Sequence, residues 1–286
     1  MAKDTFLNVK HTLQTGGRLT DLRRPRIMGI LNITPDSFYG SSRMNSVDEA
    51  LRQAEAFLDE GATFIDIGGY SSRPGAAPVS EEEEMKRLLP VIKAITKKLP
   101  GALISVDTFR AAVARESILA GAHLINDISG GSMDGAMFKT VAALKAPYIL
   151  MHMKGTPQTM QQQASYQNLI LELTGYFSEK IAALKQLGVH DIILDPGFGF
   201  AKTLDHNYEL MQHLQDFQIF GLPLLTGISR KTMIYKLLET DADNALNGTT
   251  ALNTVALLKG SSILRVHDVK AAAECITLTE KLKQSH

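Results

Sequence analysis

The chain has 286 residues, of which 44% are hydrophobic, and this suits one large core and a single (β/α)8 barrel. The 30 lysines and arginines balance the 30 aspartates and glutamates, so the charge does not indicate binding to nucleic acid or to an anionic membrane. The single cysteine, Cys275, excludes an intramolecular disulfide framework, and its helical spacing predicts a buried structural thiol. No apolar run is long enough to cross a bilayer, so we expect a cytoplasmic protein.

Residues 1–22 do not follow the alternation that begins later. The sequence Thr15-Gly16-Gly17-Arg18 is a turn signal between two short stretches with apolar residues, 6–13 and 19–22. We therefore predict an N-terminal β-hairpin extension over 1–22 and a single domain over 23–286.

From residue 26 onward, eight short apolar runs alternate with segments of helical spacing, and each run ends in a polar side chain. Runs buried on both faces and tipped with polar groups are typical of parallel strands in an α/β barrel, where the chemistry lies at the carboxyl ends. The predicted fold is therefore a (β/α)8 TIM barrel with these groups on one rim. The polar tips are Asn32, Asp66, Asp107, Asn126, His152, Asp195, Ser229 with Lys231, and Arg265 with His267.

Helix signals fill the gaps between the runs. Ser46 with Glu49 and Ser80 with Glu83 have the spacing of capping boxes. Four glutamates at 81–84 resemble a metal cluster, but acidic residues in a first turn offset the helix dipole, so the structural interpretation is favoured. Longer helices are predicted over 166–187, 244–259 and 268–282.

Three short polar acceptors, Asp107, Asn126 and Asp195, end different strands and would be costly to bury unpaired. A heterocycle with a 2-aminopyrimidinone edge offers adjacent N–H donors, which a carboxylate accepts in bidentate fashion. Each carboxylate taken singly could instead cap loop amides. Taken together, the three residues favour a binding site.

Potential cations follow the last strands. Arg265 and His267 lie two residues apart, and Lys231 adds a third cation in the preceding loop. Loops after strands seven and eight commonly hold phosphate in such barrels, so diphosphate is a natural ligand, although a solvated basic rim remains open. Asn32 could be one ligand of a magnesium ion that bridges phosphates, or only the start of a turn. Arg73 could be a fork for carboxylate or phosphate, or a solvated loop residue.

The motifs, in this order, resemble the dihydropteroate synthase family from about Ile27 to Val269. They are GILNITPDSF (29–38), DIGG (66–69), RPGA (73–76), SVDT (105–108), NDISGG (126–131), DPGFGF (195–200), SRK (229–231) and RVHD (265–268). The resemblance implies a TIM-barrel transferase of folate synthesis that joins 4-aminobenzoate to (7,8-dihydropterin-6-yl)methyl diphosphate. It also implies Mg²⁺ as cofactor, a homodimer, and inhibition by sulfonamides.

The resemblance further implies roles for individual residues. The pterin would be held by Asp107, Asn126, Asp195 and Lys231, with Met151 packing beside it. The aminobenzoate would be surrounded by Ser72, Arg73, Phe200 and Ser229. The diphosphate would be held by Arg265 and His267, with magnesium on Asn32. The residues implied in catalysis are Arg73, Lys231, Arg265 and His267.

Two positions depart from the family pattern. Tyr70 and Ser72 stand in a loop that more often reads Glu-Ser-Thr-Arg, and Ala201 stands where glycine is usual. One alternative is a pterin-dependent methyltransferase barrel, which would have no use for the basic tip of the last strand. The other is a non-catalytic pterin-binding paralogue, against which the retained Asn32 and Lys231 argue. No dedicated nucleophile is expected, because diphosphate leaves readily once cations neutralise it.

Overall fold

Eight parallel strands form the centre of the molecule. The structure, a computed structural model, describes residues 9–33, 43–70 and 79–284. The strands pair in the order β8-β7-β6-β5-β4-β3-β10-β9, and a bridge between Leu194 and Leu224 joins the two ends of the sheet. The predicted TIM barrel is confirmed. The strands are β3 (Arg26–Asn32), β4 (Phe64–Gly68), β5 (Leu103–Asp107), β6 (Leu124–Asp127), β7 (Tyr148–Met151), β8 (Ile192–Asp195), β9 (Leu225–Thr226) and β10 (Ile263–Val266).

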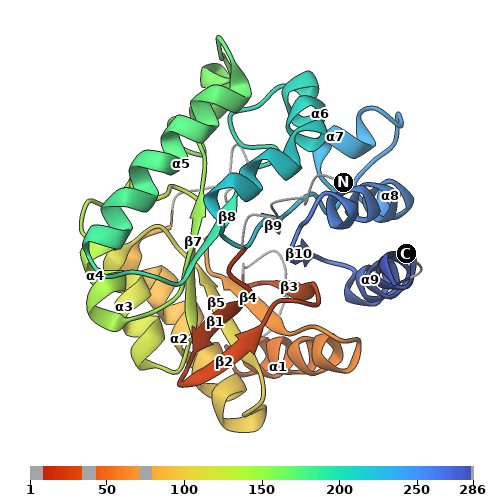
Figure 1. The fold of residues 1–286 in the computed structure, drawn as a ribbon. Helices are drawn as coiled ribbons and strands as arrows, with labels where there is room; N and C mark the ends of the chain where they lie inside the picture. The colour runs from red at the N-terminus through yellow and green to blue at the C-terminus, as the bar shows by residue number, and fades with distance from the viewer. Residues whose placement is uncertain (1–8, 34–42, 71–78, 285–286) are drawn as a thin grey trace.

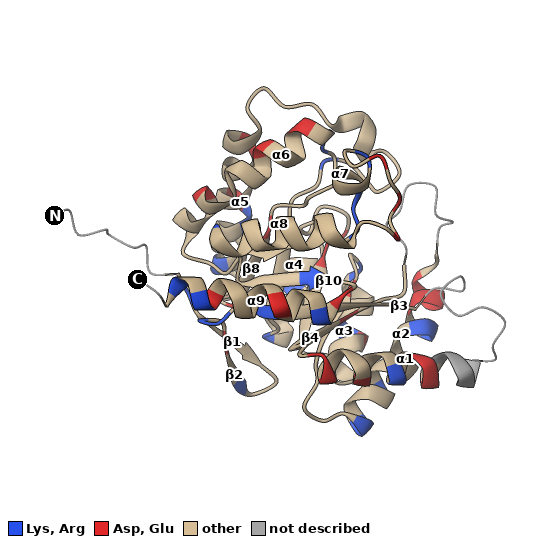
Figure 2. Ribbon diagram, turned by 90° about the vertical axis from the view of Figure 1, so that its right-hand side faces the viewer, with Lys and Arg blue, Asp and Glu red and all other residues tan. Residues whose placement is uncertain are grey.

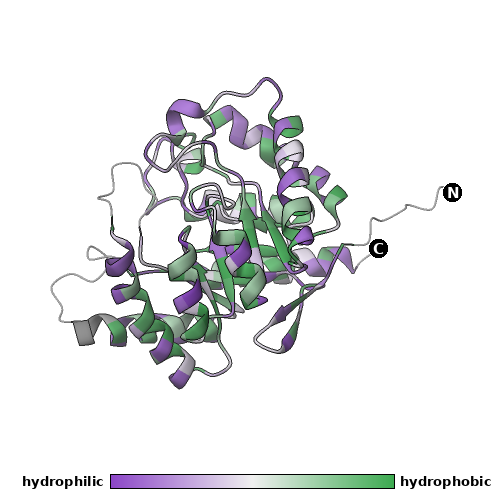
Figure 3. Cartoon of the chain, turned by 90° about the vertical axis from the view of Figure 1, so that its left-hand side faces the viewer, coloured by the Kyte–Doolittle hydropathy of each residue, from purple (hydrophilic) through white to green (hydrophobic). Residues whose placement is uncertain are grey.

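Helices alternate with the strands and surround them, as Figure 1 shows. Figure 3 shows the hydrophobic strands inside and the hydrophilic helix faces outside. Because the strands are covered on both faces, both of their faces are apolar. The helices are α1 (Arg43–Asp59), α2 (Glu81–Lys98), α3 (Ala111–Leu119), α4 (Met137–Leu144), α5 (Leu169–Gln186), α6 (Leu204–Gln212), α7 (Thr232–Tyr235), α8 (Leu246–Leu258) and α9 (Val269–Lys283), with 3-10 turns η2 (Met160–Gln163) and η3 (Leu214–Phe220).

The core has two apolar layers. The larger layer lies between strands and helices and includes Cys275, which is 3% exposed as predicted for a structural thiol. The predicted stripe on α5 is buried in the same layer: Leu169, Leu173, Phe177, Ile181 and Leu184. The smaller layer fills the amino-terminal end of the barrel: Met28, Phe64, Leu124, Ile149, Ile193, Leu225 and Ile263.

The predicted N-terminal hairpin closes that end of the barrel. Strands β1 (Thr12–Thr15) and β2 (Arg18–Asp21) pair antiparallel around a Gly16-Gly17 turn. Leu13 and Leu22 are 0% and 2% exposed because they complete the inner layer of the barrel. The amino-terminal end is thus filled with hydrophobic side chains, and polar chemistry is confined to the opposite end.

Helix starts agree only in part with the sequence. Ser80 is the N-cap of α2 and accepts from the amide of Glu83 at 3.1 Å, but the Glu83 side chain pairs with Arg87. The capping box predicted at Ser46 and Glu49 is wrong, because α1 begins three residues earlier and both positions lie inside it. The spacing of a capping box also occurs between positions one turn apart within a helix. Among the helices that the structure describes, none combines the length and apolar character needed to cross a bilayer.

Candidate functional site

Polar side chains gather at the carboxyl ends of the barrel strands. Side chains alternate along a strand, so the inward positions that are apolar at the amino end carry Asp66, Asp107, Asn126, Asp195 and Arg265 toward the rim. Several of these polar side chains are buried: Asp66 is 0%, Asn126 3% and Asp195 6% exposed. The predicted convergence of strand tips is therefore what the structure shows.

Arg265 links two carboxylates inside the barrel. Its Nε donates to Asp66 Oδ2 at 2.6 Å, and its Nη2 donates to Asp107 Oδ2 at 2.9 Å. Asn126 Nδ2 also donates to Asp66 Oδ2 at 2.9 Å. Burial raises the pKa of Asp107, and the Arg265 guanidinium opposes that shift. The guanidinium is fixed in direction by two anions, so it is held in one orientation before any ligand binds.

Asp66 was expected only as a strand tip and not as a site residue. It sits in the apolar run of β4, aligned with Ser105 of β5 and Ile30 of β3. Asp66 could have been found from the alternation of side chains along β4, which places it on the same inward face as Phe64. A carboxylate on that face needs a cationic partner across the barrel.

Of the two uses that the sequence left open for Asp195, the structure shows the capping of a loop amide. Its Oδ1 accepts from the amide of Gly197 at 2.8 Å, which caps the following loop. Among the described hydrogen bonds, this is the one that its carboxylate accepts, so Oδ2 is left for a ligand. Burial raises the pKa of Asp195, and Lys231 opposes the shift.

Lys231 stands across from this carboxylate. Its ammonium donates to the carbonyl of Phe198 and lies 4.7 Å from the centre of the Phe200 ring. Burial lowers the pKa of Lys231 to about 8, while Asp195 acts in the other direction. The lysine therefore stays cationic at neutral pH and presents its charge both to the carboxylates of Asp195 and Asp107 and to the Phe200 ring.

One wall of the site is apolar. Met151, the predicted packing partner of the pterin, is 2% exposed in this wall. The other buried members are Phe109, Ile128, Met153, Met160 and Ala201, with Tyr70, Met133 and Phe200 partly buried beside them. Flat polarisable rings pack well against thioethers and aromatic faces. The wall thus suits a planar ligand whose edge reaches the carboxylates.

The tips of β9 and β10 are joined by Ser229 and His267. Ser229 Oγ lies 3.1 Å from His267 Nδ1, and the amide of His267 donates to Ser229 Oγ at 3.1 Å. Next to them, Arg230 pairs with Asp268 through two nitrogens, at 2.9 and 2.8 Å. Ser229 thus orients His267, a role that the sequence did not indicate.

Two predicted site residues, Ser72 and Arg73, lie outside the described residues. Asn32 ends β3 beside Gly68, where a Cβ would lie 3.6 Å from Asn32 Oδ1 and 3.6 Å from Asp107 Cβ. The described residues contain no group of three or more histidine, cysteine or acidic side chains able to hold a metal. An amide oxygen near a carboxylate fits a magnesium ion that keeps its waters and is bound mainly through a ligand's phosphates.

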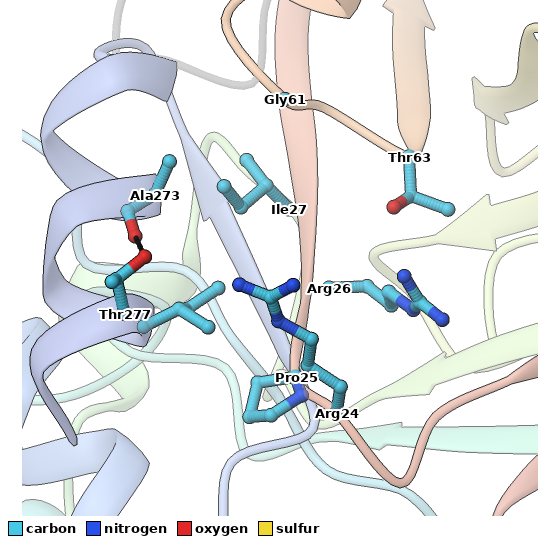
Figure 4. Close-up of a pocket in the computed structure, with 9 residues that line it drawn as sticks. Arg24, Pro25, Arg26, Ile27, Gly61, Thr63, Ala273 and Thr277 are labelled. Atoms are coloured by element: carbon cyan, nitrogen blue, oxygen red, sulfur yellow. Dashed lines mark hydrogen bonds between the residues drawn. The ribbon is translucent and has the colours of Figure 1, made fainter. Parts of the chain in front are cut away.

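A cavity elsewhere in the molecule does not belong to this site. Figure 4 shows it at the start of β3, against α9, where Arg24 and Arg26 approach Thr63 and Thr277. Arg24 there pairs with Glu280 at 2.9 Å, and Arg26 donates to a backbone carbonyl. The cavity lies at the amino-terminal end of the barrel, whereas barrel enzymes work at the carboxyl end.

Comparisons with known proteins agree with this geometry. The "Pterin binding enzyme" family matches residues 28–267. A dihydropteroate synthase of Escherichia coli K12 is 46% identical over 266 residues, covering 92% of this chain and 94% of its own. A Yersinia pestis dihydropteroate synthase with a sulfonamide drug complex has a TM-score of 0.89 at 44% identity, covering 96% and 99%. A Xanthomonas albilineans dihydropteroate synthase with 4-aminobenzoic acid has a TM-score of 0.88 at 36% identity, covering 96% and 98%.

Proposed function

The chain belongs to the dihydropteroate synthase family of pterin-binding enzymes, and from that premise we propose how its rim residues divide the reaction among them. Like these relatives, it is a transferase of folate synthesis that joins 4-aminobenzoate to (7,8-dihydropterin-6-yl)methyl diphosphate, giving dihydropteroate and diphosphate. One observation carries the assignment of roles. Buried acceptors and fixed cations from different strands meet at one end of the barrel, beside an apolar wall.

The pterin is held by its edge. Asp195 Oδ2 accepts from adjacent N–H groups of the aminopyrimidinone, and Asp107 and Asn126 complete the acceptors. Met151 packs against one face of the ring. The burial that raises the pKa of Asp195 also strengthens these charge-assisted bonds, because little water competes for the carboxylate.

The diphosphate is held at the tips of the last strands. Arg265 and His267 project from neighbouring positions of one strand end, and Ser229 sets the direction of the imidazole. Asn32 is the protein ligand of Mg²⁺ in this assignment. The ion, when bound, would neutralise charge on the leaving diphosphate.

The aminobenzoate packs against the face of the Phe200 ring that the Lys231 ammonium does not cover. The Phe200 ring offers a face for the benzene ring, and the ammonium 4.7 Å from its centre keeps that face oriented. Ser72 and Arg73 are assigned to the same substrate as predicted.

The reaction needs positioning more than acid–base catalysis. The bond between the pterin methylene carbon and the diphosphate oxygen breaks, and the amine nitrogen forms a bond to that carbon and loses one proton. The electron-rich dihydropterin supports positive charge on the methylene, while the cations stabilise the departing anion. Arg265 is held in place by Asp66 and Asp107, so its charge needs no reorganisation when the bond breaks.

We also propose a homodimer, formed through α8 and α9. These helices lie side by side, and Figure 2 shows α8 without a charged residue along its length. Leu258, Leu278 and Leu282 are 55%, 68% and 59% exposed on this pair of helices. Exposed apolar clusters of this kind mark interaction sites. Light scattering on the purified protein should give twice the chain mass, and the Leu278→Lys variant should shift it toward the monomer. A monomer at all concentrations would contradict the proposal.

A cytoplasmic location fits the same assignment, since the one cysteine is buried and unpaired.

The direct test of the roles is diphosphate release by the purified protein. Release should require both substrates and Mg²⁺, and Arg265→Lys, which keeps a cation beside Asp66 but loses the second donor for the diphosphate, should slow it sharply. Release without 4-aminobenzoate would instead indicate a hydrolase that uses the same pterin site.

A further inference from the structure

The loop after β8, residues 196–203, is built around a buried ammonium. Lys202 is 4% exposed, and its Nζ donates to the carbonyls of Gly197 at 3.0 Å and Phe200 at 3.1 Å. The same atom lies 3.2 Å from His152 Nδ1 at the tip of β7. One side chain thus ties both ends of the loop to the neighbouring strand.

The backbone of this loop curls around the lysine. Gly197, Gly199 and Ala201 all have positive φ, at 74°, 80° and 48°, so alternate residues turn in the left-handed direction. Gly197 also passes so close to the carbonyl of His152 that a Cβ there would lie 2.1 Å from its oxygen. Loop geometry of this kind leaves inward-facing carbonyls, and the Lys202 amino group donates to two of them.

His152 is suited to accept from the ammonium. Burial lowers the pKa of His152 to about 2, with Lys202 adding to the effect, so the ring is neutral, and in the tautomer protonated on Nε2 its Nδ1 accepts from Lys202. The ring packs edge-on against Tyr176 at 4.9 Å, which fixes its direction. The lysine is thus satisfied by three neutral acceptors, with Asp195 acting on it only through space.

The outer side of the loop is held by other residues. The amide of Gly199 donates to Asn207 at 2.6 Å, and the hydroxyl of Tyr166 donates to the carbonyl of Ala201 at 2.9 Å. On the side that faces the site, Lys231 donates to the carbonyl of Phe198. Phe200 therefore projects from a segment whose inner contacts all converge on Lys202.

We infer that Lys202 is a positioning residue that sets the place of the Phe200 ring and thereby the affinity for the aromatic amine substrate. The inference rests on the proposed role of Phe200 as the face against which 4-aminobenzoate packs. Lys202 is assigned a positioning role because its amino group is buried on His152 and on the carbonyls of Gly197 and Phe200. Its loss leaves the Phe200 carbonyl without its lysine donor and the Gly197 carbonyl with only the Phe200 amide, at 3.1 Å, so the loop must shift to bring in water.

The test compares steady-state kinetics of Lys202→Met with those of His152→Phe. The first variant removes the ammonium, and the second keeps an aromatic ring but removes the acceptor. Lys259→Met is the matched control, because Lys259 also donates to a backbone carbonyl, that of Gln212, but lies away from the rim. Wild-type turnover is measured first, so that a failure of the proposed function is recognised separately.

The expected result is a rise of about tenfold in the KM for 4-aminobenzoate in Lys202→Met, with the KM for the pterin diphosphate within about threefold. His152→Phe should raise the ratio of the KM for 4-aminobenzoate to the KM for the pterin diphosphate by a smaller factor, and Lys259→Met should leave that ratio unchanged. If the wild type turns over but this ratio of KM values is unchanged in the folded Lys202→Met and His152→Phe variants, the inference is wrong. Equal increases in both KM values would likewise overturn it, because they would indicate general loosening of the barrel rim.

Discussion

Arg265 and Asp66 form an ion pair of 2.6 Å inside the barrel, although 199 residues separate them in the chain. The two strands that carry them, β10 and β4, both pair with β3. Asp66 is fully buried, and its Oδ1 has no hydrogen-bond partner among the described residues. The Arg265 cation is therefore what makes this buried carboxylate tolerable, and Asp66 in turn fixes the cation that we propose binds the diphosphate.

Replacing Asp66 with asparagine should destabilise the protein and slow turnover together. The change leaves Arg265 with one anion in place of two, and breaking a buried pair costs about 3–5 kcal/mol. Urea denaturation gives the first quantity and steady-state kinetics the second. Glu82→Gln, which breaks the exposed Lys86–Glu82 pair, is the control and should change neither. A full loss of activity without loss of stability would mean that Asp66 contacts substrate directly.

Replacing Asp195 with asparagine should weaken pterin binding selectively. The variant keeps an oxygen to accept from the Gly197 amide, so the loop remains capped, but an amide then faces the pterin donors. We expect a loss of about 2–4 kcal/mol in binding free energy. Calorimetry with the pterin substrate measures it. An unchanged affinity would show that the carboxylate is only a loop cap.

The same residue predicts an acid limit for binding. Burial raises the pKa of Asp195, and only the ionised form accepts two N–H donors, so pterin affinity should fall as the pH drops through that raised value. The Asp195→Asn variant should lose this contribution and keep only the acid limb of Asp107, whose pKa burial raises to about 7. Binding titrations from pH 4 to 7 compare the two proteins. Identical pH profiles would assign the limb to another group.

Lys231 predicts an alkaline limit. Its pKa is lowered to about 8 by burial, so the cation is present below that pH and is lost as the pH rises through it. Turnover should therefore decline above about pH 8. Lys231→Arg should move the limb to higher pH, since arginine stays charged, at some cost in rate. A limb at the same pH in both proteins would exclude Lys231 as its origin.

Lys202 links pH to stability. Burial lowers its pKa to about 7, whereas in the unfolded chain the lysine titrates near its ordinary pKa of 10.5. Between these values the unfolded state binds one more proton, so stability should rise with pH by up to about 1.4 kcal/mol per unit. Asp195 opposes the shift, and Lys231 and Lys154 add to it. Relative to Lys202→Met, wild type should gain stability from pH 7 to 9, measured by urea denaturation. A constant difference would contradict this.

The barrel and its rim could be predicted because each strand ends in a polar residue within a short apolar run, and parallel strands bring their carboxyl ends together. Asp66 was harder to place, because a carboxylate inside such a run has a partner only across the barrel. The burial of Lys202 could not be predicted, since it depends on three left-handed backbone positions, one of them alanine. The capping box predicted at Ser46 was wrong because two residues three positions apart inside a helix have the same spacing as a capping box. The roles of Ser72 and Arg73 stay predictions.

The central claim is that this site forms a carbon–nitrogen bond between the two substrates. The most direct measurement is mass spectrometry of the product formed from 4-aminobenzoate labelled with ¹⁵N at the amine, with diphosphate quantified in the same reaction. We predict dihydropteroate that retains the label, formed in equal amounts with diphosphate, and only with Mg²⁺ present. Diphosphate released without labelled product, or no turnover by a folded protein that binds both substrates, would contradict the account.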